Sequence, residues 1–216
     1  MMGFPNILNE SEPNQDEHTK LVMAALILAI SITRSPIMIP LQAFQGVAVS
    51  AFLKQQHRPA AAFVKPAAAV LGIGAVGAAA AYLIGPLLFK LIYPPKGDAQ
   101  AAYAEVVTGT VLGVLVFASA LLALMTLSGN MVLAINGHCA YVAGWAAAAA
   151  VAVAVAFFAP LPLVPRAIAA LCVGPVCGFA VHLSAMMVHA RSVQALSEGE
   201  ALREMLVENT VRGETH

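Results

Sequence analysis

The chain has 216 residues, of which 60% are hydrophobic and only 10% are charged, and its mean hydropathy is +0.83. Soluble globular domains contain about 25% charged residues, so this composition excludes an ordinary soluble domain. The formal net charge is zero, and no basic patch indicates a nucleic-acid partner.

Acidic residues are confined to the two ends of the chain and one loop. No Asp or Glu occurs from Thr19 to Gly97, or from Val106 to Ser197. Apolar sequence of this length predicts an all-α integral membrane protein, because a helix satisfies its own backbone hydrogen bonds within lipid. We predict a bundle of about five transmembrane helices, with spans at residues 21–53, 67–92, 105–136, 141–158 and 166–189.

Polar segments flank the predicted bundle, which occupies residues 21–190. Residues 1–20 form a polar, acidic N-terminal segment without the basic and apolar regions of a signal peptide. Residues 191–216 form a charged tail, predicted to be in part a short amphipathic helix that then frays. Lysine and arginine are slightly more frequent in the tail and in the loop 54–66 than on the opposite side. This bias predicts a cytoplasmic C-terminus.

The first predicted span, SITRSPIMIPLQAFQG in its central part, is longer than the ~20 residues that cross a bilayer. Pro36 and Pro40 are predicted to bend it and to act as a hinge, because each removes a backbone donor and clashes with the preceding turn. We expect membrane lipid to surround this helix, so lipid is the first partner that the sequence predicts.

A polar stripe runs along the same helix. With Arg34 as the origin of a helical wheel, Gln45 lies at about 20°, Ser31 at about 60° and Gln42 at about 80°. The four side chains occupy about a quarter of the circumference, and Leu, Ile, Ala, Val and Phe fill the rest. A stripe of this kind predicts a helix that borders a hydrated cavity.

Arg34 admits two interpretations. A charge at mid-bilayer costs about 2.5–3.5 kcal/mol on insertion scales, and no carboxylate lies close to it in the sequence. Either the guanidinium attracts an anionic substrate group, for which phosphate is the best match, or it caps backbone carbonyls that Pro36 and Pro40 release.

His182, in the fifth predicted span, is a second candidate. It is either a titratable partner in transport or a side chain that hydrogen-bonds to a neighbouring helix. The three cysteines show neither zinc nor redox spacing, and we expect them to pack: Cys139, Cys172 and Cys177. Paired acids, a metal-spaced His/Cys set, a P-loop and a nucleophile elbow are all missing from the sequence. We therefore expect neither an enzyme nor a cofactor or metal site.

Small residues recur at helical spacing in two later spans. Gly109 and Gly113 form one such pair, and Gly174 and Gly178 form another. Pairs of this kind let helices approach closely in lipid, so we predict that both serve helix packing.

Four stretches follow one another in a recognisable order: TRSPIMIPLQAFQG, GPLLFKLIYPP, SGNMVLAINGH and YVAGW. Over about residues 20–190 they resemble the C-terminal half of polysaccharide flippases of the multidrug/oligosaccharidyl-lipid/polysaccharide exporter superfamily, of the actinobacterial polysaccharide-biosynthesis type. The resemblance implies a fold of about 12–14 spans in two similar bundles and alternating access to a central cavity. It also implies that Arg34 holds the diphosphate of a polyprenyl-diphosphate-linked glycan.

The chain is much shorter than such flippases, and its head, MMGFPNILNES, resembles the middle of a longer protein. A single bundle cannot form a cleft between two bundles. We therefore expect a second membrane bundle or a homo-oligomer as a partner. The alternative function is a non-transporting membrane scaffold or accessory subunit that binds partner helices.

Overall fold

The computed structural model describes residues 11–53, 59–95, 97 and 99–213, and every regular element in these ranges is a helix. The helices are α1 (Ser11–Leu53), α2 (Pro59–Ile92), α3 (Ala99–Val106), α4 (Gly109–Ala134), α5 (His138–Phe158) and α6 (Leu163–Gly213). Five of them contain a stretch that is long and apolar enough to cross a membrane: Glu17–Pro36, Phe63–Ile92, Gly109–Ala134, His138–Phe158 and Leu163–Ala201. For the described residues, this confirms the prediction of an all-helical chain with five such helices.

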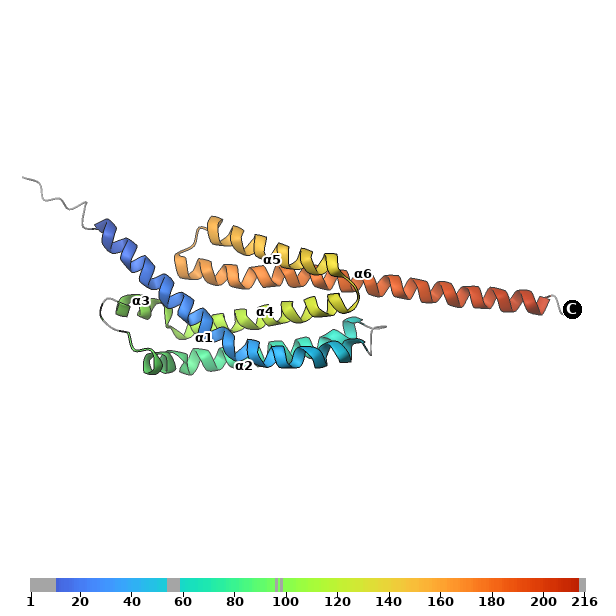
Figure 1. The fold of residues 1–216 in the computed structure, drawn as a ribbon, viewed down its shortest axis with the longest axis horizontal. Helices are drawn as coiled ribbons and strands as arrows, with labels where there is room; N and C mark the ends of the chain where they lie inside the picture. The colour runs from blue at the N-terminus through green and yellow to red at the C-terminus, as the bar shows by residue number, and fades with distance from the viewer. Residues whose placement is uncertain (1–10, 54–58, 96, 98, 214–216) are drawn as a thin grey trace, which may run out of the picture.

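Helix α4 is the centre of the bundle. It packs against α1, α2, α5 and α6, and 56% of its apolar stretch is buried, against 6% for α2 and 11% for α5. Figure 1 shows α2 and α4 running side by side, with α5 and α6 as a second pair. Helices α2 and α5 therefore lie on the outside of the bundle, where lipid would cover their exposed apolar side chains.

Glycines set the distance between the paired helices. On α4, a Cβ atom at Gly109 would overlap the backbone of α2, and one at Gly113 would lie 3.0 Å from the backbone oxygen of Ala78 on α2. On α6, a Cβ atom at Gly174 would lie 2.9 Å from the backbone oxygen of Ala148 on α5. The prediction that these glycines serve close helix packing is confirmed.

Helix α1 begins within the polar N-terminal segment 1–20, so the later part of that segment is continuous with the first span. Val22 and Ala29 belong to its buried face, which packs against α3 and α4. Figure 1 shows that α1 changes direction part-way along its length. Pro36 and Pro40 both lie within this helix, where neither can donate a backbone hydrogen bond.

The third predicted span, 105–136, is divided between two elements. The short helix α3 ends before α4 begins, and Thr108 occupies the N-cap position of α4. Its Oγ1 accepts a hydrogen bond from the backbone N–H of Val111 at 3.2 Å. A threonine in this position satisfies one of the amides that a helix start leaves free, which favours a new helix at this point.

Helix α6 continues from the membrane region into the charged tail. The sequence prediction ended the fifth span at residue 189 and placed a separate short helix after it, but the structure has one helix of 51 residues. At 1.5 Å per residue its length is roughly 75 Å, and Figure 1 shows its C-terminal part extending beyond the other helices. Neither proline nor glycine occurs between His189 and Gly199, so nothing in that sequence breaks the helix.

Candidate functional site

Arg34 lies on α1, within the apolar part of the helix, and its side chain is half-buried. Among the described residues, no carboxylate forms an ion pair with its guanidinium. The ion pair that the structure shows in the described ranges joins His18 to Glu105, with Nε2 and Oε2 3.6 Å apart. An arginine in this position is costly to keep beside lipid and attracts an anion.

The other residues of the predicted stripe have different surroundings. Ser31 is exposed, and its Oγ donates to the backbone oxygen of Ile27 at 2.8 Å. Three predicted residues lie in α1 with side chains outside the described part of the structure: Pro40, Gln42 and Gln45. That this polar stripe borders a hydrated cavity therefore stays a prediction.

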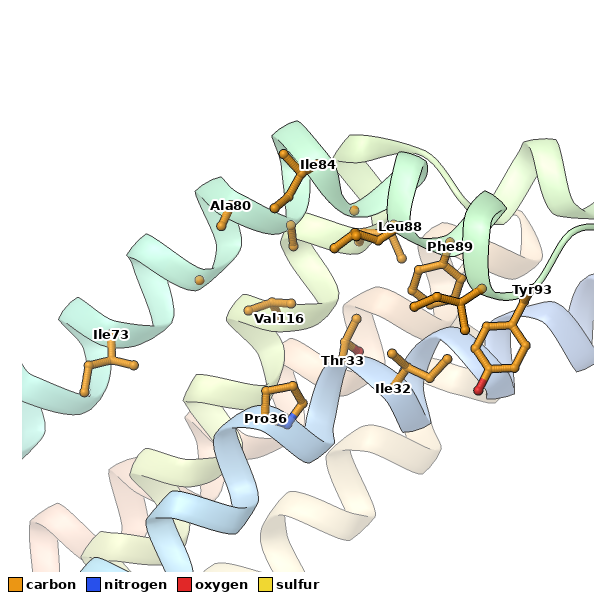
Figure 2. Close-up of a pocket in the computed structure, with 15 residues that line it drawn as sticks. Ile32, Thr33, Pro36, Ile73, Ala80, Ile84, Leu88, Phe89, Tyr93 and Val116 are labelled. Atoms are coloured by element: carbon orange, nitrogen blue, oxygen red, sulfur yellow. The ribbon is translucent and has the colours of Figure 1, made fainter.

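A groove of about 380 Å³ lies between α1, α2 and α4 (Figure 2). Its lining is almost entirely apolar and includes Ile32 and Pro36 of α1, Ile84 and Leu88 of α2, and Val116 of α4. Within the membrane-spanning part of the bundle, such a groove suits a hydrocarbon chain better than a sugar or a phosphate.

Polar contacts in this groove are few. Thr33 is part of its lining, but its Oγ1 donates to the backbone oxygen of Ala29 at 2.7 Å. Arg34, which follows Thr33 on α1, is not among the residues that line the groove. The structure thus brings Thr33, and not Arg34, to the groove.

His182, the second predicted site residue, is 0% exposed and lies where α4, α5 and α6 meet. Its Nδ1 lies 3.0 Å from Oγ of Ser128 on α4, and its Nε2 lies 3.3 Å from the backbone oxygen of Tyr141 on α5. The ring of Tyr141 is parallel to the imidazole, with the two centroids 6.1 Å apart. The structure therefore shows the hydrogen bonding between helices that was one of the two interpretations of this histidine.

Two glycines make room for the imidazole. A Cβ atom at Gly144 of α5 would overlap the ring of His182, and one at Gly129 of α4 would lie 3.1 Å from its Cε1. Sequence reasoning missed both glycines, Ser128 and Tyr141 as neighbours of the histidine. The signal for them was a small residue close to a polar or aromatic one inside an apolar span, in SGN and in YVAGW.

A second hollow, of about 610 Å³, lies near the turn from α4 to α5 and opens to the outside. It is lined in part by Cys139 and Ala140 of α5 and by Val181, Ser184 and His189 of α6. The three cysteines are free thiols, and no group of three or more potential metal ligands occurs among the described residues.

Comparison with known proteins finds relatives but no family model and no solved structure that match. The chain is 36% identical over 186 residues to the uncharacterized protein Rv1510 of Mycobacterium tuberculosis (strain ATCC 25618 / H37Rv). It is 32% identical over 186 residues to the uncharacterized protein Rv3630 of the same strain and to the uncharacterized protein Mb3654 of Mycobacterium bovis (strain ATCC BAA-935 / AF2122/97). Each match covers 86% of this chain, and the chain spans about 40% of the length of these relatives.

Proposed function

We propose that this chain forms one helical bundle of a membrane transporter that moves a lipid-linked polysaccharide precursor across the bacterial plasma membrane by alternating access. In this proposal Arg34 binds the diphosphate that links the glycan to its polyprenyl carrier. The protein transports its substrate and does not change it chemically.

The observation that carries the proposal is the half-buried guanidinium of Arg34, which has no carboxylate partner among the described residues of an otherwise apolar helix bundle. Arginine presents several N–H donors in a fixed plane and matches phosphate oxygens with two parallel bonds.

Two further observations support a larger assembly. The relatives are longer proteins, of which this chain matches about 40%. The outer helices α2 and α5 bury only 6% and 11% of their apolar stretches. Both fit a bundle that works beside a second one, either in a partner chain or in a second copy. The lysine and arginine bias supports a cytoplasmic C-terminus.

The test replaces Arg34 and measures glycan export in a bacterial strain whose own copy of the gene is deleted. We expect Arg34→Ala to reach the membrane in normal amount but to lose export, and Arg34→Lys to keep part of it, because lysine retains the charge without the planar fork. Arg166→Ala is the matched control, since Arg166 is also half-buried and lies near the start of the apolar stretch of α6. Normal export by an Arg34→Ala protein present at normal level would overturn the proposal.

A scaffold or accessory subunit is the second candidate, and the exposed apolar faces of α2 and α5 favour it. In that case Arg34 contacts a partner helix. Arg34→Ala would then reduce the amount of a co-purifying membrane protein, and the addition of lipid-linked glycan would not restore it.

A further inference from the structure

If the imidazole of His182 is neutral, the ring and Ser128 together have too few hydrogen atoms to make a hydrogen bond at each of their three close polar contacts. Oγ of Ser128 lies 2.8 Å from the backbone oxygen of Met125 and 3.0 Å from Nδ1 of His182, while Nε2 lies 3.3 Å from the backbone oxygen of Tyr141. Both backbone oxygens can only accept. The serine has one hydrogen and a neutral imidazole has one, so a neutral ring allows two of these three bonds at a time.

A protonated ring allows all three bonds at once. Nε2–H then donates to Tyr141, Nδ1–H donates to Oγ of Ser128, and the serine hydroxyl donates to Met125. In the neutral state Nε2–H still donates to Tyr141, and the hydroxyl of Ser128 turns to donate to Nδ1. Gaining or losing the proton therefore needs only the rotation of one hydroxyl group, with no movement of a helix.

The surroundings of His182 contain no acid. Helix α4 has no titratable side chain, and no Asp or Glu occurs from Val106 to Ser197, a range that covers α4, α5 and the membrane part of α6. From α5, the phenol of Tyr141 belongs to the ring that is stacked on the imidazole. Helix α2 approaches α6 through Phe63, and the Lys65 that follows is exposed. The groups that face the ring are thus neutral dipoles and an aromatic face.

The open hollow near the turn from α4 to α5 does not reach His182, which is 0% exposed, but it is lined by residues next to His182 and Tyr141 in the chain. Val181 and Ala140 line the hollow and are the chain neighbours of His182 and Tyr141. His189, which also lines it, lies two helical turns from His182 on the same side of α6.

We propose that His182, with Oγ of Ser128 and the backbone oxygen of Tyr141, forms a proton-binding site where α4, α5 and α6 meet. A bound proton makes both bonds from the ring charge-assisted, which strengthens the connection between the three helices. The site is independent of Arg34 and of any lipid-linked substrate, so the inference goes beyond the proposed transport function. Within a transporter, it would supply a proton-coupling site without a buried carboxylate.

The test follows the imidazole nitrogens of the full-length protein by ¹⁵N NMR in lipid nanodiscs, from about pH 8 down to about pH 5, the range in which histidine changes charge. The variant His182→Gln identifies the signals of this ring. We expect the ring to carry its hydrogen on Nε2 at the upper end and to gain a second N–H as the pH falls. A ring that stays singly protonated over the whole range would overturn the proposal.

Substitution of the serine tests the role of the acceptor. Ser128→Ala should weaken proton binding about tenfold, because a hydrogen bond from a charged donor is worth more than one to a neutral ring. Ser119→Ala is the matched control, since Ser119 is buried on the same helix and donates only to the backbone oxygen of Leu115; it should leave the transition unchanged. If Ser128→Ala does not fold, Ser128→Cys, with its weak acceptor sulfur, should shift the transition in the same direction. An unchanged midpoint in the folded Ser128 variant would also overturn the proposal.

Discussion

A Cβ atom at Gly178 of α6 would lie 2.7 Å from the backbone oxygen of Gly144 on α5. Gly178 is one helical turn before His182, and Gly144 makes room for the ring of that histidine. The close approach of α5 and α6 and the placement of the buried imidazole therefore depend on the same pair of glycines. A methyl group added at either glycine should therefore disturb both the helix contact and the imidazole.

We expect Gly178→Ala to lower the free energy of unfolding by about 1–3 kcal/mol, as overpacking does in a filled interior. The new methyl group would meet a backbone oxygen, which cannot turn away as a side chain can. The measurement is the Tm of the purified protein in detergent. Gly72→Ala is the control, because no atom lies within 4 Å of a Cβ at Gly72; its Tm should not fall. Equal Tm values for wild type and Gly178→Ala would contradict the close packing of α5 on α6.

Aqueous labelling of single cysteines should decide whether the polar stripe of α1 borders water. The proposed function predicts that a membrane-impermeant thiol reagent modifies Ser31→Cys and Arg34→Cys in the native membrane. Ala29→Cys should be protected, because Ala29 is 0% exposed, and Ile39→Cys should be protected by lipid, although Ile39 is 68% exposed. The background lacks the three native cysteines: Cys139, Cys172 and Cys177.

Protection of all four positions would mean that the stripe packs against protein or lipid. The guanidinium of Arg34 would then have a structural role, and a scaffold or accessory subunit would become the better proposal for the function of the chain. Labelling at Gln42→Cys and Gln45→Cys would extend the hydrated surface along the rest of the predicted stripe.

Tyr103 on α3 gives a pH-dependent prediction outside the spans. Burial of the phenol raises its pKa above the ordinary value of 10.0, and Tyr93 adds to the shift. Between the unfolded and the folded pKa, the unfolded chain has lost a proton that the folded chain keeps. Stability contributed by the neutral phenol is therefore present below about pH 10 and is lost as the pH rises through the folded pKa.

The measurement for Tyr103 is Tm as a function of pH on the alkaline side. Tyr103→Phe should show a shallower decline than wild type above about pH 10, because phenylalanine has no proton to lose. Tyr82→Phe, at an exposed position, should decline as wild type does. If Tyr103→Phe follows the wild-type curve, ionisation of this phenol does not limit stability.

The C-terminal part of α6 should be dispensable for the stability of the bundle. The described side chains from Gln194 to Ala201 are all exposed, so removal of residues 198–216 deletes no buried contact among them. We expect the free energy of unfolding to change by less than about 0.5 kcal/mol, as for other surface changes. A clear fall in Tm for the truncated protein would mean that the tail packs against the bundle.

Several features of the fold could be predicted from the sequence because they depend on composition. Apolar segments free of acids indicate spanning helices, and the glycine pairs indicate where helices approach closely. The start of α4 was harder to predict, since Val106 to Thr108 is as apolar as the helices around it and only the cap at Thr108 marks the boundary. The continuity of α6 was also missed, because the change from apolar to charged sequence suggested an end where the backbone has none.

The candidate site divides in a similar way. Histidine and arginine in an apolar span are conspicuous, so Arg34 and His182 could be selected from the sequence alone. Their partners could not, because Ser128 and Tyr141 are ordinary residues far away in the chain and become neighbours only when α4, α5 and α6 pack together. The groove between α1, α2 and α4 has no sequence signature either, since its lining resembles any lipid-facing surface.

The length of α6 has a mechanical consequence. The helix begins at Leu163, and its part from His189 to Gly213, which contains the charged residues of the tail, continues as the same helix for roughly 35 Å. A rigid rod pivoting in the bilayer acts as a lever, so a tilt of about 10° would displace its far end by roughly 6 Å. A small rearrangement around α6 inside the membrane would thus produce a larger displacement at the C-terminal end of the helix.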